Sequence, residues 1–420
     1  MTSKKTKRCF VYITLPGETE PNTAARFELT DGVGKLVYGK SYLARKNAVE
    51  IDPVELKLGT KLFETAQLGG VFGALRDASP DYWGRLIIDR ASGKAKHDEI
   101  DYLLQSADDR AGALGFGHYE KPPAPKREFN KTLDLKKLQD IALDVLKDQA
   151  KVTGAEAQQV EKLMLLGTSM GGMRPKAVVE DNKGLWIAKF NKPDDRWNNA
   201  RVEHAMLTLA RRCGIAAAES RVVKVGNRDV LLVKRFDREK TKKGYLRTRM
   251  VSGLTLLRAE DSQADRAKWS YPALAEELRR ICADPEDTAR ELFRRMVFNA
   301  LISNTDDHPR NHAVIARTTS WGLSPAYDLT PTPSAGMERD LAMTVGNLGR
   351  RATAQNLVTQ SPRFLISQAE SGGIVAEMEE IVRSQWETVA RGAKVTVKDC
   401  GTIRNALENE GFNFTAELAQ

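Results

Sequence analysis

The sequence has 420 residues, of which 41% are hydrophobic and 29% charged, which is enough for two or three domains with cores of their own. The formal net charge of +9 favours acidic partners such as nucleic acid or phosphorylated ligands, although the basic residues are scattered and form no single tract. No apolar run approaches the length of a membrane span and no signal-like region follows the basic N-terminus, so we expect a cytoplasmic protein without membrane contacts.

The first part of the chain, residues 1–125, is predicted to form a β-rich domain. A helix is expected to follow its first strands, with Asp77 or Ser79 as the capping residue and Pro80 near the first turn. A second turn, at 108–116, leads into another strand. The strand-like runs are short and separated by glycines: 9–13, 25–29 and 35–38.

A proline-rich, charged segment at 121–127 is the best linker candidate and leads into a second part, residues 126–237. This part opens with an amphipathic helical pattern over 133–145. A glycine-rich segment at 167–176 follows, and its adjacent glycines would let backbone N–H groups approach phosphate oxygens. It is not a Walker A motif, and a plain hairpin loop explains this segment about as well when it is taken alone.

Two predicted strands follow this loop, at 177–179 and 185–190, and a turn at 181–184 joins them into a hairpin. Lys189 falls within the apolar second strand, where its ammonium group either stays in solvent at an edge or reaches into a cleft to meet phosphate. A glycine-rich loop followed by a strand-borne lysine is typical of the phosphate-holding unit of protein kinases. Glu203 lies beside the next helical stripe and would pair with Lys189 in a kinase, but a solvated glutamate on the helix flank is the alternative.

The apolar strand at 229–233 ends in the charged segment Lys234, Arg235 and Phe236. In a two-lobed kinase this is where the connecting segment passes the adenine. Its backbone groups would then bind the base, and Phe236 would flank the pocket. Without a kinase interpretation it is an ordinary strand end.

The third part, residues 238–420, is predicted to be mostly helical. An amphipathic pattern over 292–301 predicts a buried helix, and a polar cluster at 304–312 follows it directly. Catalytic groups are often presented on loops that a rigid scaffold holds in place. We therefore expect the chemistry of this protein at 304–312.

Within that cluster, Asp306 is the expected catalytic base, which would accept the proton of a substrate hydroxyl. Asn311 lies five residues further on, the offset found between Asp and Asn in the catalytic loop of protein kinases. Asp328 follows a predicted strand, and with Asn311 it is expected to bind Mg²⁺. His308 is expected to touch the nucleotide or to order the loop, and Asp307 to face solvent. A polar turn with capping carboxylates is the alternative.

The joint pattern resembles the HipA family of serine/threonine kinases, which are toxins of bacterial type II toxin–antitoxin pairs. The front of the chain is also similar to the N-terminal domain of that family, so the resemblance covers nearly the whole sequence. The segments that carry it are 72–84, 108–116, 167–176, Lys189, 233–238, 304–311 and 325–328.

The resemblance implies an α/β, two-lobed protein-kinase-like fold with an N-terminal β-rich subdomain and a mostly helical C-terminal lobe. It implies ATP and Mg²⁺ as cofactors. Asp306 matches the catalytic aspartate of the family, while Asn311 and Asp328 match the metal ligands. The residues that would line the nucleotide site by this match are Ser169, Gly171, Gly172, Met173, Arg174, Pro175, Lys176, Lys189, Lys234, Arg235, Phe236, His308, Asn311, Tyr327 and Asp328.

Ser169 matches the serine that family members autophosphorylate. A phosphate there adds nearly two negative charges and is expected to eject the loop from the ATP site. The family also implies a small helix-turn-helix antitoxin (HipB-like), operator DNA bound through that antitoxin, and a protein substrate such as an aminoacyl-tRNA synthetase. Two residues depart from the family pattern. Lys234 stands where an acidic residue is frequent, and Pro309 stands where a small residue is expected.

Two other functions remain open at this point. A small-molecule phosphotransferase on a related fold is one, although such enzymes do not usually carry a β-rich front domain. A weakly catalytic co-repressor subunit, bound to an antitoxin and DNA, is the other. The presence of Asp306, Asn311 and Asp328 weighs against that second alternative.

Overall fold

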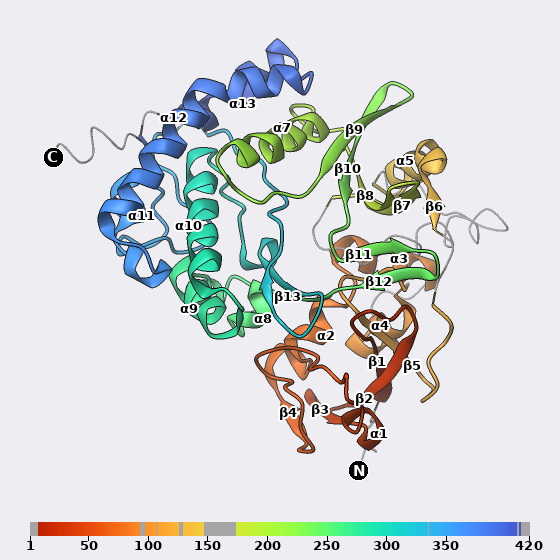
Figure 1. Ribbon diagram of the computed structural model, residues 1–420. Helices are drawn as coiled ribbons and strands as arrows, with labels where there is room; N and C mark the ends of the chain where they lie inside the picture. The colour runs from red at the N-terminus through yellow and green to blue at the C-terminus, as the bar shows by residue number, and fades with distance from the viewer. Residues whose placement is uncertain are drawn as a thin grey trace. The chain divides into compact units, whose positions relative to one another are not determined.

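The computed structural model describes residues 7–92, 97–106, 108–125, 129–146, 174–334, 336–409 and 411–412. The chain divides into two compact units (Figure 1). None of the described helices is both long and apolar enough to cross a membrane. The domain boundaries expected near residues 125 and 237 stay a prediction. Unit 1 comprises Met1–Lys192, Leu232–Val251 and Ile315–Ser320, and unit 2 comprises Pro193–Leu231, Ser252–Val314 and Trp321–Gln420.

An antiparallel five-stranded sheet forms the N-terminal part of unit 1, in the order β4-β3-β2-β1-β5 (Figure 1). Asp31 and Gly32 link its second and third strands with positive φ angles of 50° and 76°, as type I′ hairpin turns require. The inward-facing Val11, Phe27 and Leu36 are fully buried, so the β-rich front is confirmed. The strands are β1 (Lys7–Thr14), β2 (Pro21–Thr30), β3 (Val33–Tyr38), β4 (Phe63–Thr65) and β5 (Leu114–Gly117).

The helix expected after Pro80 is present, but its predicted capping residue is wrong. Asp77 is the last residue of α2, and the amide of Ser79 is bonded back to that short helix, so neither residue opens the next one. Asp81 opens it instead, because its Oδ1 accepts a hydrogen bond of 2.7 Å from the amide of Gly84. The helical segments of unit 1 are α1 (Lys40–Leu43), η1 (Gln67–Gly69), α2 (Gly73–Asp77), α3 (Tyr82–Ser92), α4 (Glu99–Gln105), η2 (Thr132–Asp134) and α5 (Leu135–Leu146).

The strands that carry the predicted phosphate-binding lysine also belong to unit 1. β7 (Lys176–Asp181) pairs antiparallel with β8 (Gly184–Phe190), and β6 (Asn130–Lys131) pairs parallel with β7. In this register Lys176 lies directly opposite Lys189, so both side chains project from the same face. The predicted hairpin is therefore confirmed. The remaining strands of unit 1 are β11 (Arg238–Thr241), β12 (Gly244–Arg247) and β13 (Arg249–Ser252). The last residue of β13, Ser252, belongs to unit 2.

Unit 2 is built around α10 (Pro285–Leu301), the buried helix predicted from its apolar pattern. Asp284 caps it and Pro285 occupies its first turn, an arrangement suited to a helix start. α9 (Tyr271–Ile281) and α12 (Gln368–Gly392) pack against it (Figure 1). The other elements are α7 (Asn199–Arg212), β9 (Ser220–Val225), β10 (Arg228–Lys234, which continues into unit 1), α8 (Gly253–Leu256), η3 (Arg266–Lys268), η4 (Pro309–Asn311), β14 (Ala313–Ala316, also continuing into unit 1), β15 (Gly322–Leu323), α11 (Ala354–Val358), η5 (Ser361–Phe364) and α13 (Val397–Leu407).

Candidate active site

The polar loop that was predicted to carry the chemistry follows α10 directly in unit 2. Its two adjacent aspartates have opposite environments. Asp306 is exposed, whereas Asp307 is only 1% exposed. The expectation that Asp307 faces solvent is therefore wrong, because its carboxylate takes part in a buried hydrogen-bond network.

That network connects the loop to two helices. The Oδ2 atom of Asp307 accepts a hydrogen bond from the Tyr271 hydroxyl at the start of α9, and it lies 2.7 Å from the Nε2 atom of His312. The amide of Asn299, in α10, donates to the same Tyr271 hydroxyl at 3.2 Å. Burial and then the charge of Asp307 raise the pKa of Tyr271 well above its ordinary value, so its hydroxyl keeps its proton and remains a donor. Asp307 thus anchors the loop, with the neighbouring Asp306 on its exposed side.

The carboxyl group of Asp306 interacts with other carboxylates of unit 2. Although the side chain of Asp306 is exposed, the surrounding protein removes part of the solvent around its carboxyl group, and this effect, followed by the charges of Asp328, Asp307 and Asp261, raises its pKa, while His308 opposes the rise. Asp306 and Asp328 are therefore brought close enough to interact, although 22 positions separate them in the sequence. Carboxylates that repel one another in this way favour the binding of a cation, and a raised pKa suits a group that must accept a proton.

Asp328 itself has a strained backbone, with a φ angle of 59°. Positive φ values at residues other than glycine cluster at functional sites, and aspartate tolerates them better than most residues. The side-chain amide of Asn304 donates to the Asp328 carbonyl at 3.4 Å and to Asn299 at 2.9 Å. Nearby, Ala326 forms a parallel bridge with Ala217. Hydrogen bonds from two directions thus hold the segment that presents Asp328.

Asn311 ends the short turn η4 and is 7% exposed. Pro309 occupies the first turn of η4, where its fixed φ angle is compatible with the helical conformation, so the loop accommodates this departure from the family pattern. The hydroxyl of Tyr327 donates to the carbonyl of Arg310 at 2.8 Å. This bond ties the segment before Asp328 to the loop that contains Asn311.

The candidate metal ligands of this site are oxygen atoms of Asn311 and Asp328. Two protein ligands suit Mg²⁺, which phosphate and water also coordinate, better than a metal that only protein side chains bind. Among the residues that the structure describes, no group of three or more His, Cys, Asp or Glu side chains is arranged to hold a metal. Mg²⁺ at phosphoryl-transfer sites is commonly bound by one or two carboxylates together with phosphate oxygens and water. Asp328 offers a carboxylate and Asn311 an amide oxygen, which is the set that such a site needs.

The predicted nucleotide loop is described only at its end. Ser169, Gly171, Gly172 and Met173 lie outside the described residues. Beyond them, Arg174 and Pro175 lead into β7, where the carbonyl of Pro175 accepts a hydrogen bond from Phe190.

The two lysines of this hairpin have different surroundings. Lys176 forms an ion pair of 2.9 Å with Asp81, and the two side chains are 3% and 4% exposed. Lys189, opposite it on β8, is half-buried. In unit 2, Glu203 is 3% exposed, so the alternative of a solvated glutamate on the helix flank is wrong. The charge of Lys176 is balanced by Asp81 within the hairpin's surroundings.

The segment expected at the adenine is rigidly held within unit 1. Arg235 uses its backbone N–H to bond the Leu185 carbonyl at 2.9 Å, and its guanidinium group contacts both oxygens of Asp237 at 2.9 and 2.7 Å. Burial raises the pKa of Asp237, but the charges of Arg235 and Arg238 outweigh this effect and hold it well below its usual range. Arg235 is thus a structural anchor, and the half-buried Lys234 and Phe236 flank it.

Sequence reasoning missed the residues that support the site. Asp81 lies 95 positions from its partner Lys176, and Tyr271 lies 36 positions from Asp307. No local pattern connects residues at such separations. Two adjacent carboxylates, Asp306 and Asp307, indicate that one of them anchors the loop. Nothing in the sequence distinguishes which of the two it is.

Comparison with known proteins agrees with this description. The model of the family described as "HipA-like C-terminal domain" matches residues 168–391, which is more than half of the chain. The chain therefore belongs to the HipA-like family, as its sequence motifs predicted.

Two relatives are similar over part of the sequence. Toxin YjjJ of Escherichia coli K12 is 31% identical over 251 residues, which cover 55% of this chain and 50% of that protein. "Putative kinase Y4dM" of Sinorhizobium fredii is 27% identical over 248 residues, which cover 53% of this chain and 57% of that protein. The chain thus spans about half the length of these relatives.

The fold is shared with a solved structure. The structure of a HipA toxin–antitoxin system from Shewanella oneidensis MR-1, which contains HipA, HipB and operator DNA, has a chain that matches with a TM-score of 0.64. The match covers 95% of both chains at 14% sequence identity, a likeness that concerns the fold. The predicted α/β kinase-like fold is confirmed by this similarity.

Proposed function

We propose that this chain is an ATP- and Mg²⁺-dependent kinase that phosphorylates serine or threonine in a protein substrate, and that it is the toxin of a toxin–antitoxin pair. One observation carries the proposal. Hydrogen bonds from Asn304 to the Asp328 carbonyl and from Tyr327 to the Arg310 carbonyl join the segment of Asp328 to the loop that presents the exposed Asp306. The buried Asp307 anchors that loop. A loop that serves only as a polar turn gains nothing from holding two repelling carboxylates together.

In this proposal Asp306 accepts the proton of the substrate hydroxyl and keeps its oxygen in line with the phosphate that is transferred. Asn311 and Asp328 hold Mg²⁺, which neutralises charge on the phosphates when it is bound. His308 and Tyr327 line the same site. Because Asp307 restrains the loop, Asp306 needs little rearrangement before it acts.

ATP contacts are assigned to residues of unit 1 as well. Lys189 holds the phosphates, together with Ser169, Gly171, Gly172, Met173, Arg174, Pro175 and Lys176 of the glycine-rich segment. Backbone groups of Lys234, Arg235 and Phe236 bind the adenine. The backbone N–H of Arg235 is not available for this contact, because it already bonds to the Leu185 carbonyl. Glu203 orients Lys189. Autophosphorylation at Ser169 turns the kinase off.

The proposed partners rest on the relatives. YjjJ is named a toxin, and the Shewanella HipA structure contains HipB and operator DNA. By analogy we propose a small helix-turn-helix antitoxin for this chain and operator DNA bound through that antitoxin. The protein substrate belongs to translation, with an aminoacyl-tRNA synthetase as the leading candidate, and the chain acts in the cytoplasm.

Incubation with ATP labelled at the γ-phosphate tests the function. Label on Ser169 or on an added protein supports the proposal. Label on a small metabolite would indicate a small-molecule phosphotransferase, and no label at all would indicate a co-repressor subunit with little turnover. Each of these last two results contradicts the proposed activity.

The first prediction concerns the base. Asp306→Ala is expected to bind ATP nearly as well as the wild type but to lose phosphoryl transfer and toxicity, since only the proton acceptor is removed. Asp194→Ala removes a carboxylate from an exposed site of unit 2 and is the matched control, with transfer expected to be unchanged. Autophosphorylation of Asp306→Ala at a near-normal rate would show that the base is assigned to the wrong residue.

A further inference from the structure

Two buried asparagines lie between the segments of unit 2 that carry Asp306 and Asp328. Asn299, in the last turn of α10, is fully buried, and Asn304, at the start of the loop, is nearly so. Burying an amide side chain costs free energy unless its polar atoms are hydrogen-bonded. The partners of these two residues therefore indicate what their burial achieves.

Their hydrogen bonds form one continuous chain. The side-chain amide of Asn304 donates to the Asp328 carbonyl at 3.4 Å and to the Oδ1 atom of Asn299 at 2.9 Å. The Nδ2 atom of Asn299 donates to the Tyr271 hydroxyl at 3.2 Å, and that hydroxyl donates to Asp307. Asn299 is therefore the residue at which the bonds from the Asp328 segment meet those from Asp307.

The charged end of the chain fixes its direction. The Asp307 carboxylate only accepts hydrogen bonds, and the Tyr271 hydroxyl has a single proton, which it donates to that carboxylate. Asn299 must then turn its N–H group toward Tyr271 and its side-chain oxygen toward Asn304. Hydrogen bonds that point the same way polarise one another, so this chain resists the displacement of any of its members.

Main-chain bonds run beside the side-chain bonds. The amide of Asn304 donates to the Asn299 carbonyl at 2.8 Å, and the amide of Thr332 donates to the Ser303 carbonyl at 3.1 Å. The start of the loop thus lies between α10 and the segment that follows Asp328. Phosphoryl transfer requires that the proton acceptor and the metal ligands keep a fixed separation, which a link of this kind supplies.

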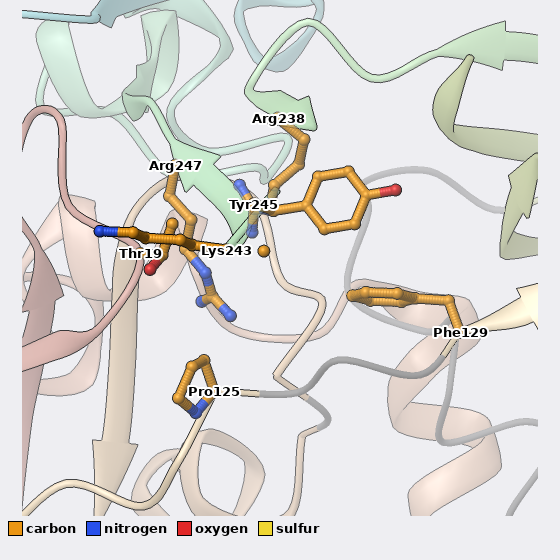
Figure 2. A pocket seen from close by; sticks show the side chains of 8 residues that line it. Thr19, Pro125, Phe129, Arg238, Lys243, Tyr245 and Arg247 are labelled. Atoms are coloured by element: carbon orange, nitrogen blue, oxygen red, sulfur yellow. The ribbon is translucent and has the colours of Figure 1, made fainter. Parts of the chain in front are cut away.

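A polar cluster of unit 1 shows a different arrangement. Figure 2 shows Arg238 and Arg247 beside a small space at the β11–β12 hairpin. Asp237 binds Arg238 at 2.8 Å, and Asp108 binds Arg247 at 2.6 Å. These ion pairs close the cluster within unit 1, and we assign it a structural role. The chain through Asn299 differs because each of its ends lies on a segment of the candidate active site.

We propose that Asn299 is a positioning residue that couples the loop at 304–312 to the segment at 326–332 and so sets the separation of Asp306 from Asp328. It acts through Tyr271 and Asn304. The inference rests on the proposed function for the roles of Asp306 and Asp328, whereas the coupling is a property of unit 2 that can be measured without ATP.

Amide hydrogen exchange of the ligand-free protein tests the coupling. Asn299→Ala cuts the chain in its middle, while Tyr271 keeps Asp307 as its acceptor and Asn304 keeps the Asp328 carbonyl. We expect faster exchange both in 304–312 and in 326–332. Tyr271→Phe removes only the hydroxyl beside Asp307, and it is expected to speed exchange of the Thr332 amide, beyond the other end of the chain.

Asn356→Ala is the matched control for a buried amide. Asn356 is also fully buried in unit 2, where it accepts from the Leu348 amide at 2.8 Å and donates to the Arg351 carbonyl at 2.8 Å. Its removal is expected to lower the melting temperature but to leave exchange in 304–312 and 326–332 unchanged. Equal acceleration by Asn356→Ala and Asn299→Ala, or an unchanged Thr332 amide in Tyr271→Phe, would overturn the proposal.

The labelled-ATP assay separates positioning from folding. Well below its melting temperature and at saturating Mg²⁺, Asn299→Ala is expected to lower kcat about tenfold and to change the KM for ATP by less than about twofold, because alignment is lost while binding contacts remain. Asn356→Ala is expected to keep the wild-type kcat. An unchanged kcat in Asn299→Ala would contradict the positioning role. A wild type without any transfer would contradict the proposed function instead, and hydrogen exchange would still decide the coupling.

Discussion

Asp306 and Asp307 are adjacent in the sequence, yet their surroundings are opposite. The buried Asp307 binds Tyr271 and His312, whereas Asp306 is exposed and is the residue that we propose meets the substrate. Because a side chain in the interior must satisfy its hydrogen bonds there, the two residues respond differently to the same substitution.

Asp307→Asn is therefore predicted to lower the free energy of unfolding by about 2–3 kcal/mol, since it removes the charged acceptor of two buried hydrogen bonds. Asp306→Asn is the matched control and is predicted not to destabilise the protein, because the side chain is exposed and its neutralisation relieves the repulsion from Asp328. Urea denaturation of both variants measures the difference. Similar stabilities would show that Asp307 does not anchor the loop.

A second prediction at this scale concerns acid stability. Burial alone would raise the pKa of Glu180, but hydrogen bonds from Lys131, Tyr245 and Lys240 outweigh it and lower the pKa to about 2. A depressed folded-state pKa stabilises the protein above the ordinary pKa of glutamate, and this contribution is lost as the pH falls from about 4.5 toward 2. Glu180→Gln is predicted to flatten the pH dependence of the unfolding free energy in that window. An unchanged slope in denaturation experiments from pH 5 to pH 2 would contradict the ion-pair network.

At the scale of elements, the sequence predicted most of what local patterns control. The apolar spacing over 292–301 predicted α10, and the turn at 181–184 predicted the β7–β8 hairpin, because both depend on neighbours in the sequence. The capping residue of α3 was predicted wrongly, since Asp77 ends one helix and Asp81 opens the next. The buried position of Asp307 could not be predicted, because it depends on Tyr271, a distant residue.

Packing between α8 and the loop at 304–312 gives a prediction for one glycine. A Cβ atom on Gly253 would lie 2.6 Å from the carbonyl oxygen of Pro309, so Gly253→Ala must displace the loop. We predict a loss of about 1–3 kcal/mol in stability and a fall in phosphoryl transfer of tenfold or more. Gly373→Ala, on α12 with nothing within 4 Å, is predicted to stabilise the protein by about 0.5–1 kcal/mol and to keep full activity. Calorimetry and the labelled-ATP assay test both variants, and equal behaviour would contradict the close packing of the loop.

At the scale of the whole molecule, the proposed ATP contacts come from both compact units. Lys189 belongs to unit 1, whereas Asn311 and Asp328 belong to unit 2. The family model matches residues 168–391, a range that includes Lys189, Asn311 and Asp328. The resemblance was recognised in the sequence because it rests on several separate motifs. Local sequence patterns do not determine which residues of unit 1 contact a nucleotide, so they do not determine the roles of individual residues there.

The central proposal of the function assigned above is that one magnesium-bound triphosphate contacts Lys189, Asn311 and Asp328. Calorimetric titration of ATP, with and without Mg²⁺, tests it most directly on the wild type and on Lys189→Ala, Asp328→Ala and Asp306→Ala. We predict that Lys189→Ala weakens binding at least tenfold, that Asp328→Ala removes the dependence on Mg²⁺, and that Asp306→Ala binds almost normally. Wild-type affinity and an intact Mg²⁺ dependence in both Lys189→Ala and Asp328→Ala would contradict the claim.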